Sequence, residues 1–511
     1  MTQTIAALGL SPLELLLVLS GLVLTASRWL PVRFGRGVAL SAAAVAVGSA
    51  IVTATAAFRW QLLVVFAGIA VGLVLALPVL RGRPRTPGKR RWPAALAGVV
   101  ALVLLAGGAA AGAALPVPAF PQPTGRYPVG STVRQWTDET RPETATDDPT
   151  DRRTVVAQLW YPAVPGAIGQ ASRYLGPDPE AATVASGVAG YLGVPAFVLD
   201  GPAQARTQAL ADAPVAAGGP FPVVLFSPGL GGVRTQNTAW AEELASRGYV
   251  VAALDHPYDS AAVVLRDGRV IATRVSATGD DAEDRRHAVG WTAIRAADLS
   301  FALSELSRLD RDASGMFHGK LDTARAAVTG HSLGGAAALQ ALRQDPRFVA
   351  AIDLDGFPYD PAPRRFTRPV LALTHPLEPG ESPDYLPRLT GVLQLSGTDA
   401  YRLEVPGTVH LSFTDAPLFL PPLPSLMGSL GRTEPIRITA EASADFLDAT
   451  LGGRTADLAD RLAALGELSA YRGGRPNAIT ARRYLAPDAR RRTIVRTERM
   501  TWAQQHDSSS G

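Results

Sequence analysis

Four long apolar segments fill the first 115 residues of this 511-residue chain. They run over residues 5–26, 38–58, 62–80 and 93–115, and each is close to the roughly 20 residues that cross a bilayer as a helix. One such segment would fit a signal peptide, but four in succession do not. We therefore predict a transmembrane region over residues 1–115. Its only internal acid, Glu14, lies near one end, where it can reach the interface or a neighbouring helix.

Basic residues are distributed unevenly among the loops between these segments. The first loop holds Arg28, Arg33 and Arg36 and the third holds a cluster over residues 81–91, whereas the second holds only Arg59. Because positively charged loops stay in the cytoplasm, an even number of spans leaves both termini outside. We predict a multi-pass protein of the cell membrane whose C-terminal half is extracytoplasmic. The scarcity of charge within the spans argues against a transporter.

Composition excludes several classes of function. The chain has no cysteine, so disulfides, thiol nucleophiles and cysteine metal sites are ruled out. The net charge is only +4, and the basic clusters lack the interleaved aromatic residues typical of nucleic-acid binding. No motif calls for a cofactor or a metal, and nothing indicates an oligomeric state.

Beyond a proline-rich linker at residues 116–130 the pattern becomes globular. Apolar strand-like segments alternate with helical ones as far as about residue 465, which predicts a mostly parallel sheet with helices on both faces. We therefore expect an α/β domain over residues 125–465 and a flexible basic tail over residues 466–511. Residues 163–217 show no firm period, although they precede the main strands and are expected to cover the pocket.

A serine stands in a sharp turn within "AAVTGHSLGGAAALQAL", at Gly330-x-Ser332-x-Gly334. The pattern alone is weak in a chain with 49 glycines. A strand-like segment before it and a helical one after it make it a candidate nucleophile elbow. Ser332 is then the expected nucleophile of an acyl-transfer reaction, and it needs a histidine base and an acid that orients the base.

In this fold the acid and then the base follow the serine along the chain. His410, late in the domain after a strand and a turn, is favoured as base over His375, which directly follows a strand. Three acids are possible: Asp353, Asp355 and Asp399. Asp355 comes last in its strand and is closest to the carboxyl edge, where α/β active sites form, but spacing alone does not exclude Asp399.

Acyl transfer also requires donors for the oxyanion. One is the backbone N–H of Leu333, directly after the serine. The glycine-rich loop "SPGLGG", residues 227–232, offers the second, which we assign to Leu230. His256 ends a strand at the same edge and is a possible substrate-lining residue, with a structural role as the alternative. His331 is expected to pack locally.

Longer blocks carry a resemblance to a known family. They are "FSPGLGGVRTQNTAWAEELASRGYVVAALDHPYDSA", "TGHSLGGAAALQALRQDPRFVAAIDLDGFPY" and "PGTVHLSFTDAP", in that order. The chain from about residue 125 to 451 resembles the platelet-activating-factor acetylhydrolase family of serine lipases. The resemblance implies an α/β-hydrolase fold and calcium-independent hydrolysis of short or oxidised acyl chains on phospholipids. It also implies Ser332, Asp355 and His410 as the triad, with Leu230 and Leu333 as oxyanion donors.

A departure from the family pattern keeps other functions open. The loop begins Pro228-Gly229 where the family often has His-Gly, and bacterial polyester hydrolases and cutinase-like lipases share this form. The alternative is therefore a general esterase or cutinase-like lipase acting on small esters. A non-catalytic membrane sensor or scaffold is disfavoured, because a binding module has no need of a complete Ser–Asp–His set. The apolar segment 415–431 is either core packing or a lipid-contacting lid.

Overall fold

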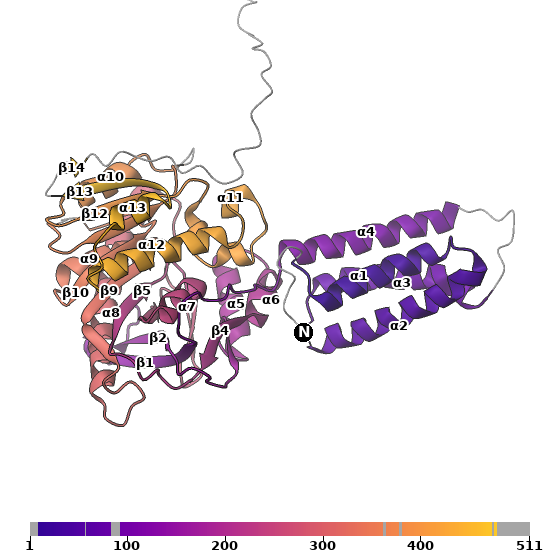
Figure 1. Cartoon of the computed structure of the whole chain (residues 1–511), viewed down its shortest axis with the longest axis horizontal. Coiled ribbons are helices and arrows are strands. Elements are labelled where there is room, and N and C mark those ends of the chain that lie inside the picture. The colour runs from indigo at the N-terminus through magenta and orange to yellow at the C-terminus, as the bar shows by residue number, and fades with distance from the viewer. Residues whose placement is uncertain are drawn as a thin grey trace, which may run out of the picture.

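A computed structural model gives the arrangement of the chain and describes residues 9–56, 58–82, 92–360, 364–377, 381–472 and 475–477. Most of the predicted basic tail, after residue 477, lies outside the described residues. So do most of the basic cluster at 81–91 and the start of the first predicted apolar segment. Two parts stand out in Figure 1: a bundle of long helices and a larger body built on a sheet.

The bundle consists of α1 (Pro12–Ser27), α2 (Val32–Ala56), α3 (Gln61–Leu80) and α4 (Trp92–Ala114). The segments Phe34–Thr55, Gln61–Leu80 and Trp92–Ala114 are long and apolar enough to cross a membrane, and α1 is a shorter apolar helix. It begins later than the predicted residue 5, because Ser11 and Glu14 form a capping box and Pro12 takes the first helical position.

Apolar side chains lie both inside and outside the bundle. Leu17, Leu24 and Leu105 are fully buried between the helices, whereas Val74 and Val103 point outward and are more than 60% exposed. A helix that is apolar all round is typical of a membrane span. The bundle therefore has the surface composition of a membrane-spanning unit.

One ion pair lies inside the bundle. Arg59 Nη2 contacts Glu14 Oε1 at 2.5 Å, and Arg59 Nη1 donates to the carbonyl oxygen of Leu115 at 3.2 Å. The guanidinium thus joins α1 to the end of α4, whose last carbonyls have no partner within their own helix. Glu14 therefore has a structural partner at the end of the bundle where the linker begins.

The larger body is built on one sheet. In the described residues twelve strands follow the order β14-β13-β12-β11-β10-β9-β5-β6-β2-β1-β4-β3. The six neighbouring strands β12, β11, β10, β9, β5 and β6 are parallel to one another. Antiparallel strands flank them, β13 next to β12 on one side and β2, followed by β1, next to β6 on the other. The bounds are β1 Val129–Pro142, β2 Arg152–Pro162, β3 Ala171–Arg173, β4 Arg206–Ala211, β5 Phe221–Ser227, β6 Val250–Asp255, β9 Leu321–His331, β10 Phe348–Leu354, β11 Val370–Thr374, β12 Ala400–Glu404, β13 Glu467–Arg472 and β14 Arg475–Asn477.

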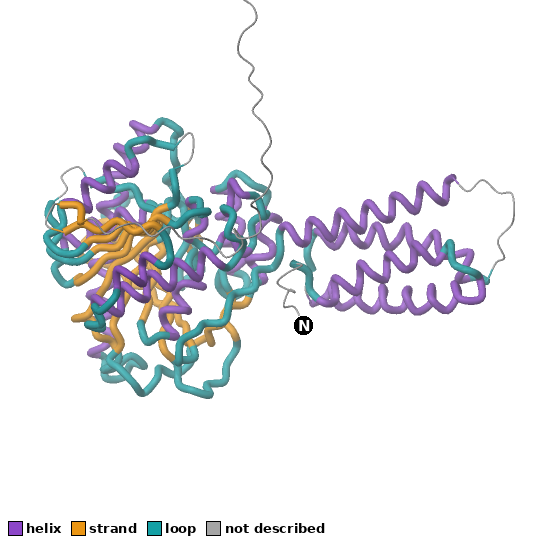
Figure 2. Tube along the Cα trace, turned by 45° about the horizontal axis from the view of Figure 1, so that its top comes forward, coloured by secondary structure: helices purple, strands orange, loops and turns teal. Residues whose placement is uncertain are grey.

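Helices cover both faces of the sheet, as Figure 2 shows. One face packs against α8 (Asp281–Arg311), α9 (Leu333–Gln344) and α10 (Tyr385–Gln394), and the other against α7 (Thr238–Ser246), α12 (Glu434–Thr450) and α13 (Leu458–Ala463). Within β5, Val223 and Leu225 join one core while Val224 and Phe226 join the other. A strand apolar on both faces belongs at the centre of such a sheet. The predicted α/β-hydrolase fold is confirmed.

The sheet continues beyond the end that the sequence predicted. β13 lies within the predicted tail, because Leu468, Ala470 and Tyr471 are buried and the strand pairs with β12. A small second sheet is formed by β7 (Ala262–Val264) and β8 (Val270–Ala272). β13 is therefore held in the sheet by its packing and by its pairing with β12, although its apolar pattern is too short to predict a strand.

The region that showed no period forms a compact layer next to the bundle. It contains β3, α5 (Glu180–Tyr191), η1 (Ala196–Leu199), α6 (Asp200–Gln204) and β4. Its buried side chains, such as Val184 and Leu199, share a cluster with Leu418 from the 415–431 segment. Of the two interpretations of that segment, core packing holds for Leu418 and Met427, which are buried. Leu423, beside α11 (Pro424–Met427), is half exposed.

This layer also meets the end of the bundle. The rings of Phe197 and Trp60 lie edge to face with centroids 4.9 Å apart. Gln204 Nε2 donates to the Phe58 carbonyl at 2.9 Å, and Arg432 Nη2 donates to the Ala113 carbonyl at 3.3 Å. The sheet domain therefore contacts the α2–α3 loop and the end of α4 (Figure 1).

Candidate active site

The carboxyl ends of five adjacent strands bring the polar residues of the site together. β6, β5, β9, β10 and β11 are neighbours in that order, and they end at Asp255, Ser227, His331, Leu354 and Thr374. Register aligns Ser227 with Gly330, and Gly330 with Asp353. The residues just beyond these ends therefore lie along a single edge of the sheet, where ligands of parallel sheets bind.

Ser332 occupies the turn between β9 and α9 with a strained backbone. Its φ is 56° and its ψ is −122°, outside the regions that side-chain-bearing residues prefer. The turn needs a glycine at 334, because a Cβ there would lie 2.0 Å from the Ser227 carbonyl oxygen. Close contact of β5 with the turn explains the glycine and gives the geometry of a nucleophile elbow.

Asp355 follows β10 and binds His410. Asp355 also has a positive φ, 59°, and its N–H donates to the Leu373 carbonyl at 2.8 Å. Its Oδ2 accepts a hydrogen bond from His410 Nδ1 at 2.6 Å. Because Nδ1 carries the donated proton, the other ring nitrogen of a neutral His410 has a lone pair available to accept one.

The same carboxylate binds a second histidine. His375 Nδ1 lies 2.7 Å from Asp355 Oδ2, and its Nε2 lies 2.8 Å from Glu381 Oε1. The His375 side chain is 4% exposed and that of His410 is 43% exposed. Both ring nitrogens of His375 are bound to carboxylates, so His410 is the better candidate for a base. His375 as a partner of Asp355 was not predicted, although it directly follows the strand next to β10.

Charge in this cluster is arranged around Asp355. Burial alone would raise the pKa of Asp355, but hydrogen bonds from His375 and His410 hold it well below its usual range. Burial alone would lower the pKa of His375, but its bonds to Asp355 and Glu381 raise it to about 9. At neutral pH, Asp355 is therefore an anion and His375 a cation.

The two other candidate acids lie elsewhere. Asp353 is fully buried, and burial together with the Asp355 charge raises its pKa well above its usual value. Its Oδ1 accepts the Gly356 N–H at 2.9 Å. Asp399 forms an exposed ion pair with Arg472 at 3.2 Å, at the beginning of β12. Neither carboxylate binds His410 in the described structure.

A cavity of about 240 Å³ opens beside Ser332. Leu230 and Leu333, the two predicted oxyanion donors, line it together with the serine. The opposite wall combines aromatic side chains with charged residues from the start of α8. The lining residues are Leu230, Ala277, Asp281, Asp284, Arg285, Ala288, Trp291, Ser332, Leu333, Phe357, Tyr359 and Ser382.

Gln236 and His331 connect the glycine-rich loop to the backbone of His410. Gly229 N–H donates to Gln236 Oε1 at 3.1 Å, Gln236 Nε2 lies 3.1 Å from His331 Nδ1, and His331 Nε2 lies 3.0 Å from the His410 carbonyl oxygen. Burial lowers the pKa of His331 to about 3, so the ring is neutral. His331 packs locally, as predicted, and links the glycine-rich loop to the backbone of His410.

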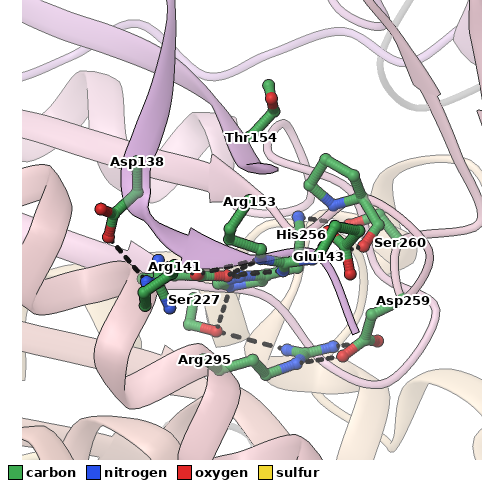
Figure 3. Close-up of polar contacts among 12 residues, drawn as sticks. Asp138, Arg141, Glu143, Arg153, Thr154, Ser227, His256, Asp259, Ser260 and Arg295 are labelled. Atoms are coloured by element: carbon green, nitrogen blue, oxygen red, sulfur yellow. Dashed lines mark hydrogen bonds and ion pairs between the residues drawn. The ribbon is translucent and has the colours of Figure 1, made fainter. Parts of the chain in front are cut away.

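Of the two roles that the sequence left open for His256, the structure favours the structural one, because His256 is not among the residues that line the cavity. It is 0% exposed, with Nε2 2.9 Å from Ser227 Oγ and Nδ1 2.8 Å from Asp298 Oδ2 (Figure 3). The turn that follows β6 and helix α8 enclose the ring, so its position at a strand end did not give it access. Arg295 and Asp298, three residues apart on α8, were missed; two charges on an apolar helix face were the available signal.

Asp355, His375 and His410 are also spaced so that a metal ion could bridge them, with ligand atoms within 4.8 Å of one another. In the structure these atoms are joined by hydrogen bonds from the two Nδ1 donors to Asp355. The two protons occupy the position that a cation would take. The cluster is therefore satisfied as a hydrogen-bonded group.

Comparison with known proteins agrees with this architecture. Residues 113–273 and 307–464 match the family described as platelet-activating factor acetylhydrolase, isoform II. The platelet-activating factor acetylhydrolase of Bos taurus is 27% identical over 281 residues, which cover 48% of this chain and 61% of that protein. A probable 1-alkyl-2-acetylglycerophosphocholine esterase of Arthroderma benhamiae is 30% identical over 138 residues, covering 27% of this chain and 31% of that protein. The matches thus span less than two thirds of these curated relatives.

A solved structure is similar as well. The ferulic acid esterase from Streptomyces cinnamoneus is 30% identical, with a TM-score of 0.54, and the match covers 65% of this chain and 93% of that one. Fold and relatives together define a protein with the α/β-hydrolase fold that is similar to known ester hydrolases. Because the family match covers more than half of the chain, the protein belongs to the platelet-activating factor acetylhydrolase family.

Proposed function

We propose that the protein is a membrane-anchored serine esterase with Ser332 as nucleophile, His410 as base and Asp355 as the acid that orients the base. The observation that carries this proposal is the 2.6 Å hydrogen bond from His410 to Asp355 at the same sheet edge as the strained Ser332. Strain at a serine with a cavity beside it is typical of a catalytic nucleophile.

The reaction proceeds in two halves. His410 takes the Ser332 hydroxyl proton as the serine oxygen bonds to the ester carbonyl carbon, and the carbonyl electrons move onto its oxygen. When that oxyanion collapses, the bond to the alcohol breaks, and His410 gives its proton to the departing oxygen. In the second half, His410 takes a proton from water as the water oxygen bonds to the acyl carbon. The bond to Ser332 then breaks, His410 returns the proton to the serine oxygen, and the carboxylic acid is released. Asp355 stabilises the imidazolium that forms in both halves.

The backbone N–H groups of Leu230 and Leu333 are the proposed oxyanion donors. Leu333 opens α9, so its N–H is one of the four that a helix start leaves without an intrahelical partner. Leu230 comes from the loop after β5, on the other side of the serine, and both residues line the cavity. Donors aimed at a developing negative charge are each worth about 10²–10³ in rate.

The helical bundle is the proposed anchor, with the catalytic domain outside the cytoplasm. The sheet domain contacts the α2–α3 loop through Phe58 and Trp60, so the α1–α2 loop lies at the opposite end with Arg28. Basic loops face the cytoplasm. The end of the bundle that contacts the sheet domain then faces out. Protease added to intact cells should cleave the C-terminal half, and full protection would contradict this orientation.

Phospholipids with short or oxidised acyl chains are the proposed substrates. The acetylhydrolase and 1-alkyl-2-acetylglycerophosphocholine esterase relatives support this class, and an anchored enzyme would meet such lipids in its own membrane. A second candidate is a general esterase. It is favoured by the ferulic acid esterase, 93% of which this chain matches, and by the aromatic wall that Trp291, Phe357 and Tyr359 give the cavity.

An activity panel separates these functions. The full chain in detergent micelles would be given short-chain p-nitrophenyl esters, 2-acetyl and oxidised phospholipids, long-chain phospholipids and methyl ferulate, with Ser332→Ala as the matched control. Cleavage of the short or oxidised phospholipids that Ser332→Ala lacks would support the proposed substrate. Cleavage of simple esters or ferulate alone would favour the general esterase. Absence of serine-dependent hydrolysis would favour a binding role.

A further inference from the structure

A buried arginine that is not among the residues lining the cavity holds the glycine-rich loop. Arg295, on α8, is 0% exposed. Its Nη2 donates to the Gly229 carbonyl at 3.0 Å, and its Nη1 donates to the Pro228 carbonyl and lies 3.3 Å from Ser227 Oγ. One guanidinium therefore binds the last residue of β5 and the two residues that follow it; Figure 3 shows its contacts with Ser227 and Asp259.

The direction of the Gly229 carbonyl matters because of the residue after it. In a trans peptide unit the C=O and the following N–H point to opposite sides. The Gly229 C=O shares its peptide unit with the Leu230 N–H, so holding the carbonyl toward Arg295 turns that N–H away from Arg295. Leu230 lines the cavity beside Ser332. The contact with Arg295 thus sets the direction of the proposed oxyanion donor.

Arg295 is itself fixed. Asp259 binds it through two hydrogen bonds, Nε to Oδ2 at 2.7 Å and Nη2 to Oδ1 at 2.6 Å. A fully buried guanidinium loses several kcal/mol of hydration, and it is retained only where a carboxylate and further acceptors replace the water. The planar fork lets one side chain bind Asp259 and two carbonyls together, which a lysine cannot do.

A second group of buried residues fixes the point where the loop begins. His256 Nδ1 donates to Asp298, so its Nε2 accepts the Ser227 hydroxyl hydrogen. Burial lowers the pKa of His256, and the ring is neutral. Asp298 is in turn bound by Arg153 Nη2 at 2.6 Å and Arg141 Nη2 at 2.7 Å. The hydrogen-bonded series Ser227–His256–Asp298 has the same order of residues as a catalytic triad, but its serine is completely buried.

We propose that Arg295 is a positioning residue of the reaction, which aims the Leu230 N–H at the oxyanion by binding the Gly229 and Pro228 carbonyls. Asp259 and the Ser227–His256–Asp298 chain support it. The inference rests on the proposed function, because it concerns the oxyanion formed at Ser332. It assigns to this buried network an effect on transition-state binding rather than on substrate binding.

The test compares Arg295→Lys with the wild type in the full chain. Arg295→Lys keeps a positive charge for Asp259 but cannot hold both carbonyls. We expect kcat for a p-nitrophenyl ester to fall about 10²–10³-fold per folded molecule, with KM within about threefold. Affinity for a trifluoromethyl ketone, which forms an oxyanion on the serine, should fall by a similar factor. A role limited to stability would lower the melting temperature and leave both quantities unchanged.

The matched control is Arg308→Gln, which removes an ion pair with Glu305 on the same helix without touching the loop or the buried network. It should keep kcat and inhibitor affinity within about twofold, since Arg308 is 68% exposed and an exposed ion pair contributes little. If Arg295→Lys does not fold, Asp259→Asn replaces it, because the amide keeps the shape and weakens the hold on Arg295. We expect a smaller parallel loss, about tenfold, in kcat and in inhibitor affinity.

The outcomes distinguish the two proposals. Equal activity of Ser332→Ala and wild type would overturn the proposed function and this inference with it. Serine-dependent activity with kcat and inhibitor affinity unchanged in Arg295→Lys, or in Asp259→Asn where it replaces that variant, would overturn the inference alone. A rise in KM with kcat unchanged would also overturn it. A parallel loss of kcat and inhibitor affinity, absent from Arg308→Gln, would support it.

Discussion

Two Ser–His–Asp groups lie at the same edge of the sheet, at the ends of the neighbouring strands β5 and β9. Of these two groups, the one with Ser332 borders the cavity described above. In the buried set, Ser227 binds His256 and His256 binds Asp298, with all three side chains fully enclosed. In the other, Ser332 lies in a strained turn on the cavity wall and His410 is 43% exposed. The residue types are alike, and in both sets the histidine Nδ1 donates to the aspartate. Access to substrate separates the proposed catalytic group from the supporting one.

The electrostatic surroundings differ as well. Asp298 is bound by Arg153 and Arg141 in addition to His256, and these contacts hold its pKa far below the usual range despite burial. Asp355 is bound by two histidines and the Tyr385 hydroxyl, without an arginine among its described contacts. An arginine is a permanent charge, whereas a histidine can gain and lose a proton. Asp298 is therefore held by permanent positive charges, whereas the described side-chain partners of Asp355 are groups that can exchange a proton.

Replacing the two serines should give the largest contrast. Ser332→Ala removes the nucleophile, and kcat/KM should fall by roughly 10⁴-fold or more. Ser227→Ala removes one buried hydrogen bond, so we expect less than about a tenfold loss of kcat/KM and a destabilisation of about 1–3 kcal/mol. Esterase kinetics and thermal unfolding of both variants measure this. A fluorophosphonate probe that labels Ser227 would contradict the comparison.

Replacing the two aspartates should separate activity from stability. Asp355→Asn should lower kcat by about 10³–10⁴-fold, because the histidine loses its orienting anion. Asp298→Asn leaves Arg153 buried without its main counter-charge and should destabilise the fold by about 3–5 kcal/mol. The two effects are read by kinetics on folded protein and by thermal unfolding. Comparable kcat losses in both variants would remove the distinction between the two sets.

His375 should make the open set sensitive to pH in a way that the buried set is not. The pKa of His375 is raised in the folded protein to about 9, from 6.5. The stabilisation from its charged form is therefore complete below about pH 6.5 and is lost as pH rises through about 9. It is on the order of 3 kcal/mol, and His375→Gln should abolish that pH dependence. Thermal unfolding of both proteins between pH 6 and 9.5 tests it, and identical slopes would contradict it.

Asp399→Asn should have the smallest effect. Its partner Arg472 is 69% exposed, and an exposed ion pair contributes between zero and about 1 kcal/mol. We expect unchanged kcat/KM and almost no shift in unfolding temperature. A large loss of activity would instead reassign the acid of the open set from Asp355 to Asp399.

The sequence predicted the open set better than the buried one, for a physical reason. Ser332 and Asp355 follow apolar strands, and glycines beside Ser332 mark a close backbone approach, so local patterns carried that information. The partners of His256 come from segments distant in sequence: Ser227 lies 29 residues before it and Asp298 lies 42 residues after it. A local sequence pattern does not predict which strand end helix α8 covers, and the burial of His256 depends on that packing. The sequence therefore left open whether His256 lines the pocket or has a structural role.

Local patterns also failed to predict two other features that depend on which strands are neighbours in the sheet. β13 was assigned to the tail because its apolar pattern is short, and only its pairing with β12 reveals it as part of the sheet. The choice between His375 and His410 followed from position along the chain. The binding of both rings to one carboxylate depends on β11 lying next to β10.

The contact between Trp60 and Phe197 has a consequence for how the enzyme would meet its substrate. With the bundle in a bilayer, a domain seated against the ends of its helices cannot diffuse through the surrounding water. Encounters with lipid then occur by lateral diffusion in two dimensions, and turnover follows the number of substrate molecules per unit area of membrane. Diluting a suspension of vesicles that carry both enzyme and lipid would leave the rate per vesicle unchanged.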